Sequence, residues 1–346
     1  MRTRRILCAG GLLLCLGASA HVQITWHLAS AYPPGSFHGE NLARFAQDVQ
    51  SRSGGRLRII VHANAHVHQP AEIKGDVHSG RAQAGEILLT QHADEAPVYA
   101  LDGLPFLARG YQEACKLYRA QKQVLQARLA DDELHLLYAV PWPPQGIFAN
   151  KAIDSLGDFK GLRFRAYSPV TSRIAQLAGA KPVTMQQAEL AQILAVAAGA
   201  DDGQSVLATG IIDAFISSAA TGFDAKAYQY FTKFYHVQAW LPKNAVIVNQ
   251  AALGALRSGT RTALLEAAAE AETRGWALSE VTDQCYRQKL RDHGMTVLQP
   301  TLTLDTGLAE IGRRMLAEWL QGAGPEGEAI IDAYHREQPT VSSPSE

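Results

Sequence analysis

Hydrophobic positions along the chain alternate between the period of strands and the period of helices. Residues 24–29 read as a strand, and Leu42, Phe45 and Val49 then recur on one face of a helix. A second strand pattern follows at residues 57–62. The first half also predicts a short helix at 70–80, a strand at 84–90 and a helix through 114–129. This alternation predicts an α/β fold with largely parallel sheets.

The second half of the chain continues the same alternation. Ser168 and Pro169 are typical of a helix start, because serine caps free backbone N–H groups and proline fits the first helical position. Gly179 is a suitable place for that helix to end. Apolar runs predict strands at 138–140, 146–150, 162–166, 182–184, 212–216 and 244–249. All but the last are assigned to a second lobe.

One helical pattern is long enough to join two lobes. From residue 260 to residue 292 it places these residues on one side: Leu264, Ala268, Ala271, Leu278, Val281 and Cys285. A chain of this length exceeds the size at which one core normally stops growing. We therefore predict two α/β lobes with a long helix that runs across both. The predicted parts are a first lobe (21–135), a second lobe (136–243), a shared strand, spine helix and C-terminal helices (244–338), and a disordered tail (339–346).

The first twenty residues have the order of a secretory signal peptide. Three arginines lie within residues 2–5, an apolar run covers residues 6–16, and small residues follow at 17–20. The apolar run is shorter than the ~20 residues that span a bilayer. We expect cleavage after Ala20 and a mature protein in the periplasm.

Composition and charge narrow the range of possible binding partners. Removing residues 1–20 takes away three arginines and no acidic residue, so the formal net charge changes from -1 to -4. A mildly acidic surface without a basic tail argues against nucleic acid or anionic lipid as a partner. No later segment is apolar for long enough to cross a membrane. Cys115 and Cys285 remain after cleavage, either as a pair or as two buried free thiols.

Arg165 is the strongest candidate for ligand binding. In residues 162–166 (LRFRA) a period of two places Arg163 and Arg165 on the same face, opposite the apolar residues. Arg165 lies nearer the carboxyl end of the strand, and ligands of open α/β sheets bind beyond those ends. A guanidinium there can hold a carboxylate by two parallel hydrogen bonds. Arg163 is interpreted as a solvated or salt-bridged residue.

A set of motifs, in a fixed order along the chain, resembles the motifs of a known protein family. These are residues 38–39 (HG), 45–49 (FAQDV), 53–57 (SGGRL), 104–107 (LPFL), 158–165 (DFKGLRFR), 179–183 (GAKPV) and 210–214 (GIIDA). Together they resemble the solute receptors of tripartite ATP-independent periplasmic (TRAP) transporters, of the C4-dicarboxylate-binding (DctP) type. The resemblance implies a two-lobed periplasmic binding protein fold with a ligand cleft between the lobes. It also implies a receptor, not an enzyme, that delivers a small organic acid to membrane permease subunits and needs no cofactor. In such receptors the arginine that closes the second-lobe motif binds the ligand carboxylate, which points to Arg165.

The resemblance also suggests further ligand contacts. Gln145 and Ser217 stand where sialic-acid receptors of the family have an arginine and an asparagine, which weakens the case for a strongly polyanionic ligand. Residues 215–222 (FISSAATG) resemble a branch that binds small monocarboxylates such as oxo acids or pyroglutamate. Trp142 and Phe215 are expected as apolar walls, with Gln145, Ser217 and Ser218 reading the polar edges. The ligand can be a mono- or a dicarboxylate.

The first lobe offers three more candidates, Ser36, His38 and Glu86. Glu86 lies on an apolar strand, and a buried acid needs a partner, either a ligand donor or a structural lysine or arginine. Residues 193–204 look like an extra stretch relative to such receptors. Insertions of this kind cost little, about 0.6 kcal/mol for each doubling of loop length.

Three other functions were weighed. His62, His66 and His68 have a spacing that suits zinc, but no acidic, histidine-rich loop accompanies them. Motifs of hydrolases, metalloproteases and phosphate-binding loops are missing from the sequence. A receptor that serves a sensor kinase would have the same binding chemistry as a transport receptor, so that alternative stays open.

Overall fold

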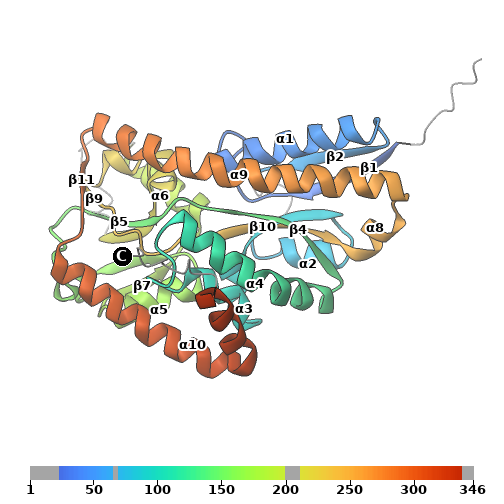
Figure 1. Cartoon of the computed structure of the whole chain (residues 1–346). Helices are drawn as coiled ribbons and strands as arrows, with labels where there is room; N and C mark the ends of the chain where they lie inside the picture. The colour runs from blue at the N-terminus through green and yellow to red at the C-terminus, as the bar shows by residue number, and fades with distance from the viewer. Residues whose placement is uncertain (1–22, 65–68, 199–210, 337–346) are drawn as a thin grey trace, which may run out of the picture.

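The computed structural model describes residues 23–64, 69–198 and 211–336. The expected signal peptide (1–20), the expected tail (339–346), His66, His68 and residues 199–204 of the extra stretch lie outside these ranges. Two sheets lie next to each other along the long axis of the molecule, and one long helix runs past both (Figure 1).

The first sheet has five strands in the order β2-β1-β3-β10-β4. β1 pairs in parallel with β2 and β3, whereas β10 runs antiparallel to both of its neighbours. The first two strands have the predicted bounds. The strands are β1 (Ile24–Ala29), β2 (Leu57–His62), β3 (Ala84–Leu88), β4 (Leu134–Pro141) and β10 (Lys243–Asn249).

The second sheet has six strands in the order β11-β9-β5-β8-β6-β7. β8, β6 and β7 run parallel, and β5 is antiparallel to β8 and β9. The strands are β5 (Gln145–Ala149), β6 (Arg163–Ala166), β7 (Lys181–Thr184), β8 (Ala214–Ser218), β9 (Lys233–Tyr235) and β11 (Thr296–Leu298).

Two expectations about the sheets need correction. Residues 138–140 were assigned to the second lobe, but β4 lies in the first sheet, where Val140 pairs with Asn244 of β10. Both sheets are also mixed, because the chain returns through β10 and β5 in the antiparallel direction. A fully buried strand is apolar on both faces, so its pattern does not identify its neighbours. The chain passes between the sheets at residues 142–144 and again at 236–242.

Helices cover both sheets. On the first sheet, α1 and α9 pack against each other on one face, and α2 and α4 lie on the other (Figure 1). The α-helices are α1 (Phe37–Arg52), α2 (Ile73–His78), α3 (Pro97–Ala100), α4 (Tyr111–Asp131), α5 (Pro169–Leu177), α6 (Gln187–Ala198), α7 (Ala219–Asp224), α8 (Gln250–Ala255), α9 (Ser258–Asp292) and α10 (Leu302–Arg336). The 3-10 helices are η1 (Leu89–His92), η2 (Leu101–Gly103), η3 (Leu156–Phe159) and η4 (Ala227–Gln229). As predicted, Ser168 caps α5 and Pro169 opens it.

The long helix α9 contacts α1 and β4 of the first lobe and α7 and β11 of the second, as predicted for a spine. Its first half buries Leu264, Ala268 and Ala271, also as predicted. The second half differs, because Val281 and Cys285 are exposed. The buried face there consists of small or polar residues: Gly275, Ser279, Thr282 and Asp283. A straight helix drifts relative to a fixed hydrophobic repeat, so the buried face moves around its axis.

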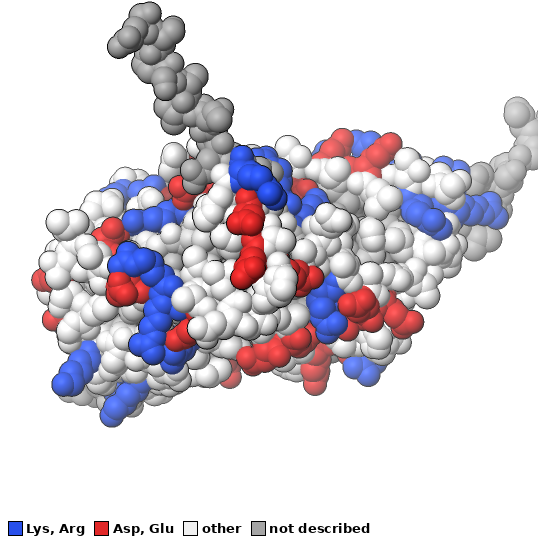
Figure 2. All heavy atoms as spheres, turned by 60° about the horizontal axis from the view of Figure 1, so that its bottom comes forward, with Lys and Arg blue, Asp and Glu red and all other residues white. Residues whose placement is uncertain are grey.

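The two cysteines are free thiols in the structure, and they are not both buried. Cys285 is exposed and Cys115 is partly exposed. Across the described ranges, no helix is long and apolar enough to cross a bilayer. On the face that carries α10, acidic and basic side chains are interspersed (Figure 2). Neighbouring charges pair along α10, as Arg314 does with Glu318, so that face presents no broad region of one sign.

Candidate ligand-binding site

A cavity of about 60 Å³ lies between the two sheets, beside the chain crossings. This volume is several times the ~10–15 Å³ that one water molecule requires. Both lobes contribute side chains. The lining residues are Ala31, Tyr32, Pro70, Leu88, Gln91, Trp142, Gln145, Arg165, Tyr167, Gln186, Gln187, Ala188, Ser217, Thr221 and Pro242. Four of the predicted site residues are among them, namely Arg165, Gln145, Trp142 and Ser217.

Arg165 extends from β6 into this cavity and is 2% exposed. Its Nε donates to the carbonyl of Met185 at 2.9 Å, and its guanidinium carbon lies 5.0 Å from the ring centroid of Tyr167. Among the described residues, nothing accepts a hydrogen bond from its Nη1. Burial lowers the pKa of Arg165 to about 10, so the group stays charged at neutral pH. A buried cation without a counter-charge is unfavourable, and an anion in the cavity would relieve that cost.

The rest of the polar lining is uncharged. Tyr167 donates its hydroxyl to Oε1 of Gln145 at 2.9 Å, and Nε2 of Gln145 donates to the carbonyl of Pro143 at 3.0 Å. Ser217 lies opposite Gly146 on the neighbouring strand. As far as the described residues show, the lining contains a single charged group, Arg165, and no acid. The cavity therefore suits a small polar molecule with one negative charge.

An aromatic wall, formed by Tyr32 of the first lobe and Trp142 of the first crossing, completes the cavity. The rings of Tyr32 and Trp142 lie 5.1 Å apart at a tilt of 59°. Nε1 of Trp142 donates to Oδ1 of Asn244 at 2.9 Å, and the hydroxyl of Tyr32 points to the same oxygen at 3.4 Å. One amide of β10 therefore fixes two rings that line the site.

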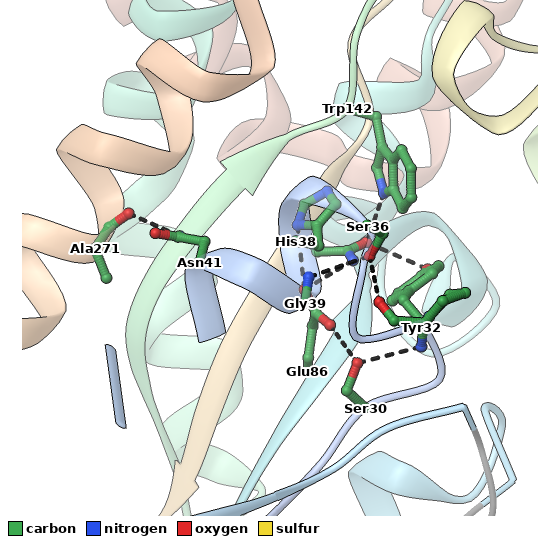
Figure 3. Close-up of polar contacts among 11 residues, drawn as sticks. Ser30, Tyr32, Ser36, His38, Gly39, Asn41, Glu86, Trp142 and Ala271 are labelled. Atoms are coloured by element: carbon green, nitrogen blue, oxygen red, sulfur yellow. Dashed lines mark hydrogen bonds and ion pairs between the residues drawn. The ribbon is translucent and has the colours of Figure 1, made fainter. Parts of the chain in front are cut away.

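A buried carboxylate lies behind this wall (Figure 3). Glu86 accepts hydrogen bonds from Ser30 Oγ at 2.7 Å and from Asn244 Nδ2 at 3.0 Å, and His38 Nδ1 lies 3.2 Å from it. Burial acts to raise the pKa of Glu86, but the contact with His38 and the hydrogen bonds from Ser30 and Asn244 outweigh it, and the pKa is lowered. Burial raises the pKa of Tyr32 well above its usual range. The network therefore holds an ionised Glu86 and a neutral Tyr32.

The start of α1 explains how Tyr32 is placed. Ser36 caps the helix, with its Oγ accepting from Gly39 N at 3.1 Å and donating to the carbonyl of Pro33 at 2.7 Å. A Cβ on Gly39 would lie 2.4 Å from the oxygen of Pro33, so only glycine permits this close approach. The helix start and the loop that carries Tyr32 are held together as one unit (Figure 3).

The structure places the other predicted site residues outside the cavity lining. Ser36, His38 and Glu86 lie behind the aromatic wall, and the partners of Glu86 include neither lysine nor arginine. Ser218 caps α7 and bonds to Thr221. Phe215 is fully buried and stacks on Phe148 with centroids 4.3 Å apart.

Strand geometry explains why Phe215 misses the cavity. Phe215 and Ser217 share one face of β8, but Phe215 lies two residues, about 6.5 Å, further from the end of the strand that reaches the cavity. Arg163 forms an ion pair with Asp213 through Nη2 at 2.5 Å, which confirms its interpretation as a salt-bridged residue.

Sequence reasoning missed several lining residues. Tyr167 lies two residues beyond Arg165, so the period of two already placed it on the same side. Gln186 and Gln187 follow the carboxyl end of β7, where ligands of α/β sheets bind. Asn244 depends on how β10 pairs with its neighbours, and Tyr32 lies on a loop whose path no pattern indicated.

No cluster of three or more His, Cys, Asp or Glu side chains suited to a metal occurs in the described ranges. His62 lies at the end of β2, where its Nε2 is 2.8 Å from Nδ1 of His27. The rest of the proposed zinc triad, His66 and His68, lies outside those ranges.

A two-lobed α/β fold with a buried binding cavity between the lobes defines the class of periplasmic solute receptors. A model of the bacterial extracellular solute-binding protein family 7 (DctP) matches residues 28–306. The chain belongs to this family, that of the TRAP solute receptors.

Solved receptors resemble this chain over most of its length. DctP6 of Bordetella pertussis, an extracytoplasmic receptor binding pyroglutamic acid, is 52% identical, with a TM-score of 0.86 over 91% of this chain and 100% of that one. DctP7 of the same organism, also binding pyroglutamic acid, is 36% identical, with a TM-score of 0.85 over 90% and 99%. A marine metagenome TRAP protein specific for pyroglutamate, from an unidentified microbe, is 37% identical, with a TM-score of 0.85 over 91% and 99%.

Proposed function

We propose that this protein captures pyroglutamate, or a closely related small acid with one carboxylate and one amide, and delivers it to the permease of a TRAP transporter. The protein would act in the periplasm after removal of residues 1–20, and it would carry out no chemistry on its ligand. The observation that carries the proposal is the buried guanidinium of Arg165. Among the described residues, its Nη1 has no partner and the rest of the cavity lining is uncharged.

The lining fits each part of such a ligand. A carboxylate would take the Nη1 donor of Arg165, with a charge-assisted hydrogen bond in a buried site. Gln145 and Ser217 can serve a lactam, because an amide side chain both donates and accepts and a hydroxyl does the same. Tyr32 and Trp142 offer apolar faces to a small ring. Three solved receptors that are 52%, 36% and 37% identical to the chain bind pyroglutamate, which supports the same ligand here.

A thermal-shift panel tests this function. Purified mature protein is melted with pyroglutamate, its neutral amide pyroglutamide, 2-oxo acids, succinate and glucuronate. Ligand at 100 times its dissociation constant adds about 2.7 kcal/mol to the free energy of unfolding. We expect pyroglutamate to give the largest rise in melting temperature and pyroglutamide, which lacks only the charge, to give little. Equal stabilisation by the acid and its amide, or none by any acid, would contradict the proposal.

A further inference from the structure

A second and larger cavity, of about 480 Å³, adjoins the ligand cavity. Its lining combines apolar surface with the polar or charged side chains of Gln69, Ser168, Ser172, Thr184, His92 and Glu95. Four residues line both cavities, namely Pro70, Gln91, Tyr167 and Gln186. These four side chains therefore lie at the boundary between the ligand site and the larger space, the partition.

The partition is closed by a hydrogen bond between the lobes. Nε2 of Gln91, on η1 of the first lobe, donates to Oε1 of Gln186 at 2.5 Å, and Gln186 stands just before α6 of the second lobe. The backbone N–H of Gln186 donates to Glu189 at 2.6 Å, which fixes the turn that presents its side chain. The pair is well placed only when the lobes meet.

The side chain of Tyr167 forms another part of the partition. The guanidinium of Arg165 stacks over its ring, and its hydroxyl donates a hydrogen bond to Gln145. The ring therefore cannot turn without breaking contacts of the ligand site. On the far side of the partition, Glu95 lines the larger cavity and is hydrogen-bonded to His92 at 2.6 Å. Glu95 also forms an ion pair with Lys74, so its charge is balanced within the first lobe.

We propose that the Gln91–Gln186 pair and the ring of Tyr167 set the length limit of the ligand. Acids that end at the partition are enclosed, and acids with an uncharged chain long enough to cross it are rejected, although space exists on the other side. The specificity of the receptor for small acids would then depend on a hydrogen bond that does not touch the carboxylate. This inference rests on the proposed function, and it adds the residues that decide ligand length.

A ligand series of graded length tests the partition. Pyroglutamate and N-acetyl-, N-butanoyl- and N-hexanoylglycine all carry one carboxylate and one amide but differ in reach. Affinities are measured by calorimetric titration for the wild type, Gln91→Ala, Gln186→Ala and the double variant. The wild type is expected to lose affinity as the acyl chain lengthens. Both single variants should shift the ratio of hexanoyl to acetyl affinity towards the long acid by about tenfold or more, within the range that pocket shape gives for added methylenes.

Two glutamines provide matched controls. Gln187 lines only the ligand cavity and Gln69 only the larger one. Gln187→Ala and Gln69→Ala should leave the length preference as in the wild type, even if overall affinity changes. Melting curves check that every variant is folded, and Gln91→Asn, which keeps the amide but shortens its reach, should behave like Gln91→Ala.

The outcomes separate the two ideas. If the wild type binds pyroglutamate but Gln91→Ala and Gln186→Ala keep the wild-type length preference, the partition has no such role and the proposed function stands. Wild-type protein that binds hexanoylglycine as tightly as pyroglutamate also overturns the partition. If the wild type binds no acid of the series, the proposed function fails first and the partition with it.

Discussion

Arg165 and Arg163 show how two like residues on one strand come to differ. Arg163 is partly exposed and bonded to Asp213, so its charge is balanced within the second lobe. Arg165 is buried against Tyr167 and keeps Nη1 free of any partner among the described residues. The difference of two positions along β6 separates a residue that stabilises the lobe from one that is available to a ligand.

This contrast leads to a prediction about affinity. Arg165→Ala should weaken binding of pyroglutamate by about 30-fold to several thousand-fold, since truncating one partner of a desolvated charge pair costs about 2–5 kcal/mol. Arg165→Lys should restore little, because an ammonium keeps the charge but lacks the planar fork. Calorimetric titration measures all three proteins.

Arg163→Ala is the internal control, on the same strand and the same face. It removes an ion pair that is partly open to solvent, so its effect on affinity should be small. The site assignment is wrong if Arg165→Ala binds within threefold of the wild type, or if Arg163→Ala is the more damaging substitution.

Glu86 gives a prediction about pH. Its pKa is lowered in the folded protein, so the carboxylate stabilises the fold above its ordinary pKa, and that contribution is lost as the pH falls through the lowered pKa. Glu86→Gln should therefore be less stable than the wild type at pH 7, by about 1–3 kcal/mol for a disturbed buried hydrogen-bond group.

The comparison isolates Glu86 from other acids with lowered pKa values, since those are common to both proteins. Urea unfolding at several pH values should show the gap between wild type and Glu86→Gln narrowing as the pH falls below about 4.3, the ordinary pKa of glutamate. A gap that stays constant down to acid pH would mean that Glu86 is not held ionised by His38, Ser30 and Asn244.

At the scale of elements, the start of α1 supports the binding site without touching the ligand. Gly39→Ala would place a Cβ 2.4 Å from the carbonyl oxygen of Pro33, a backbone atom that cannot easily move. We expect a loss of about 1–3 kcal/mol of folding stability, typical of overpacking, and weaker ligand binding through the displaced Tyr32. Gly35→Ala, where no atom lies within 4 Å of the new Cβ, is the control and should change neither. Denaturation and titration of both variants measure this, and equal behaviour would contradict it.

The bounds of strands and helices were easier to predict than the way in which the strands pair within the sheets. The strands Ile24–Ala29 and Leu57–His62 and the start of α5 were predicted from local patterns, because alternation and capping act over a few residues. The sheet membership of β4 was not, since a strand buried on both faces pairs equally well with several partners. The same reason explains which residues of the site could be predicted. Arg165 is marked by its own strand, whereas Asn244 and Gln91 join the site through contacts between distant segments.

The whole molecule depends on export for its proposed role. Residues 1–20 combine an arginine-rich start, an apolar run and small residues before His21. Full-length protein expressed in a Gram-negative host should yield a periplasmic form that begins at His21. Replacing Arg2, Arg4 and Arg5 by glutamate should retain the precursor in the cytoplasm. N-terminal sequencing of the periplasmic fraction decides the matter, and an intact Met1 there would count against export by this segment.

The last prediction concerns motion between the lobes. Arg165 is 2% exposed, and beside its cavity Gln91 of the first lobe is hydrogen-bonded to Gln186 of the second. We expect a solute to enter when the lobes separate, and the crossings at residues 142–144 and 236–242 with α9 are the connections about which they would turn.

Ligand binding should therefore favour the closed arrangement, because only that arrangement lets both lobes contact one small molecule. Small-angle scattering should show a smaller radius of gyration with saturating pyroglutamate than without it, and the ligand-bound curve should match the dimensions of this structure. The Gln91→Ala, Gln186→Ala double variant should be more open without ligand and should still contract, since Arg165 and the aromatic wall are unchanged. An identical radius of gyration for free and saturated wild type would mean that ligand enters by local movement of side chains and not by separation of the lobes.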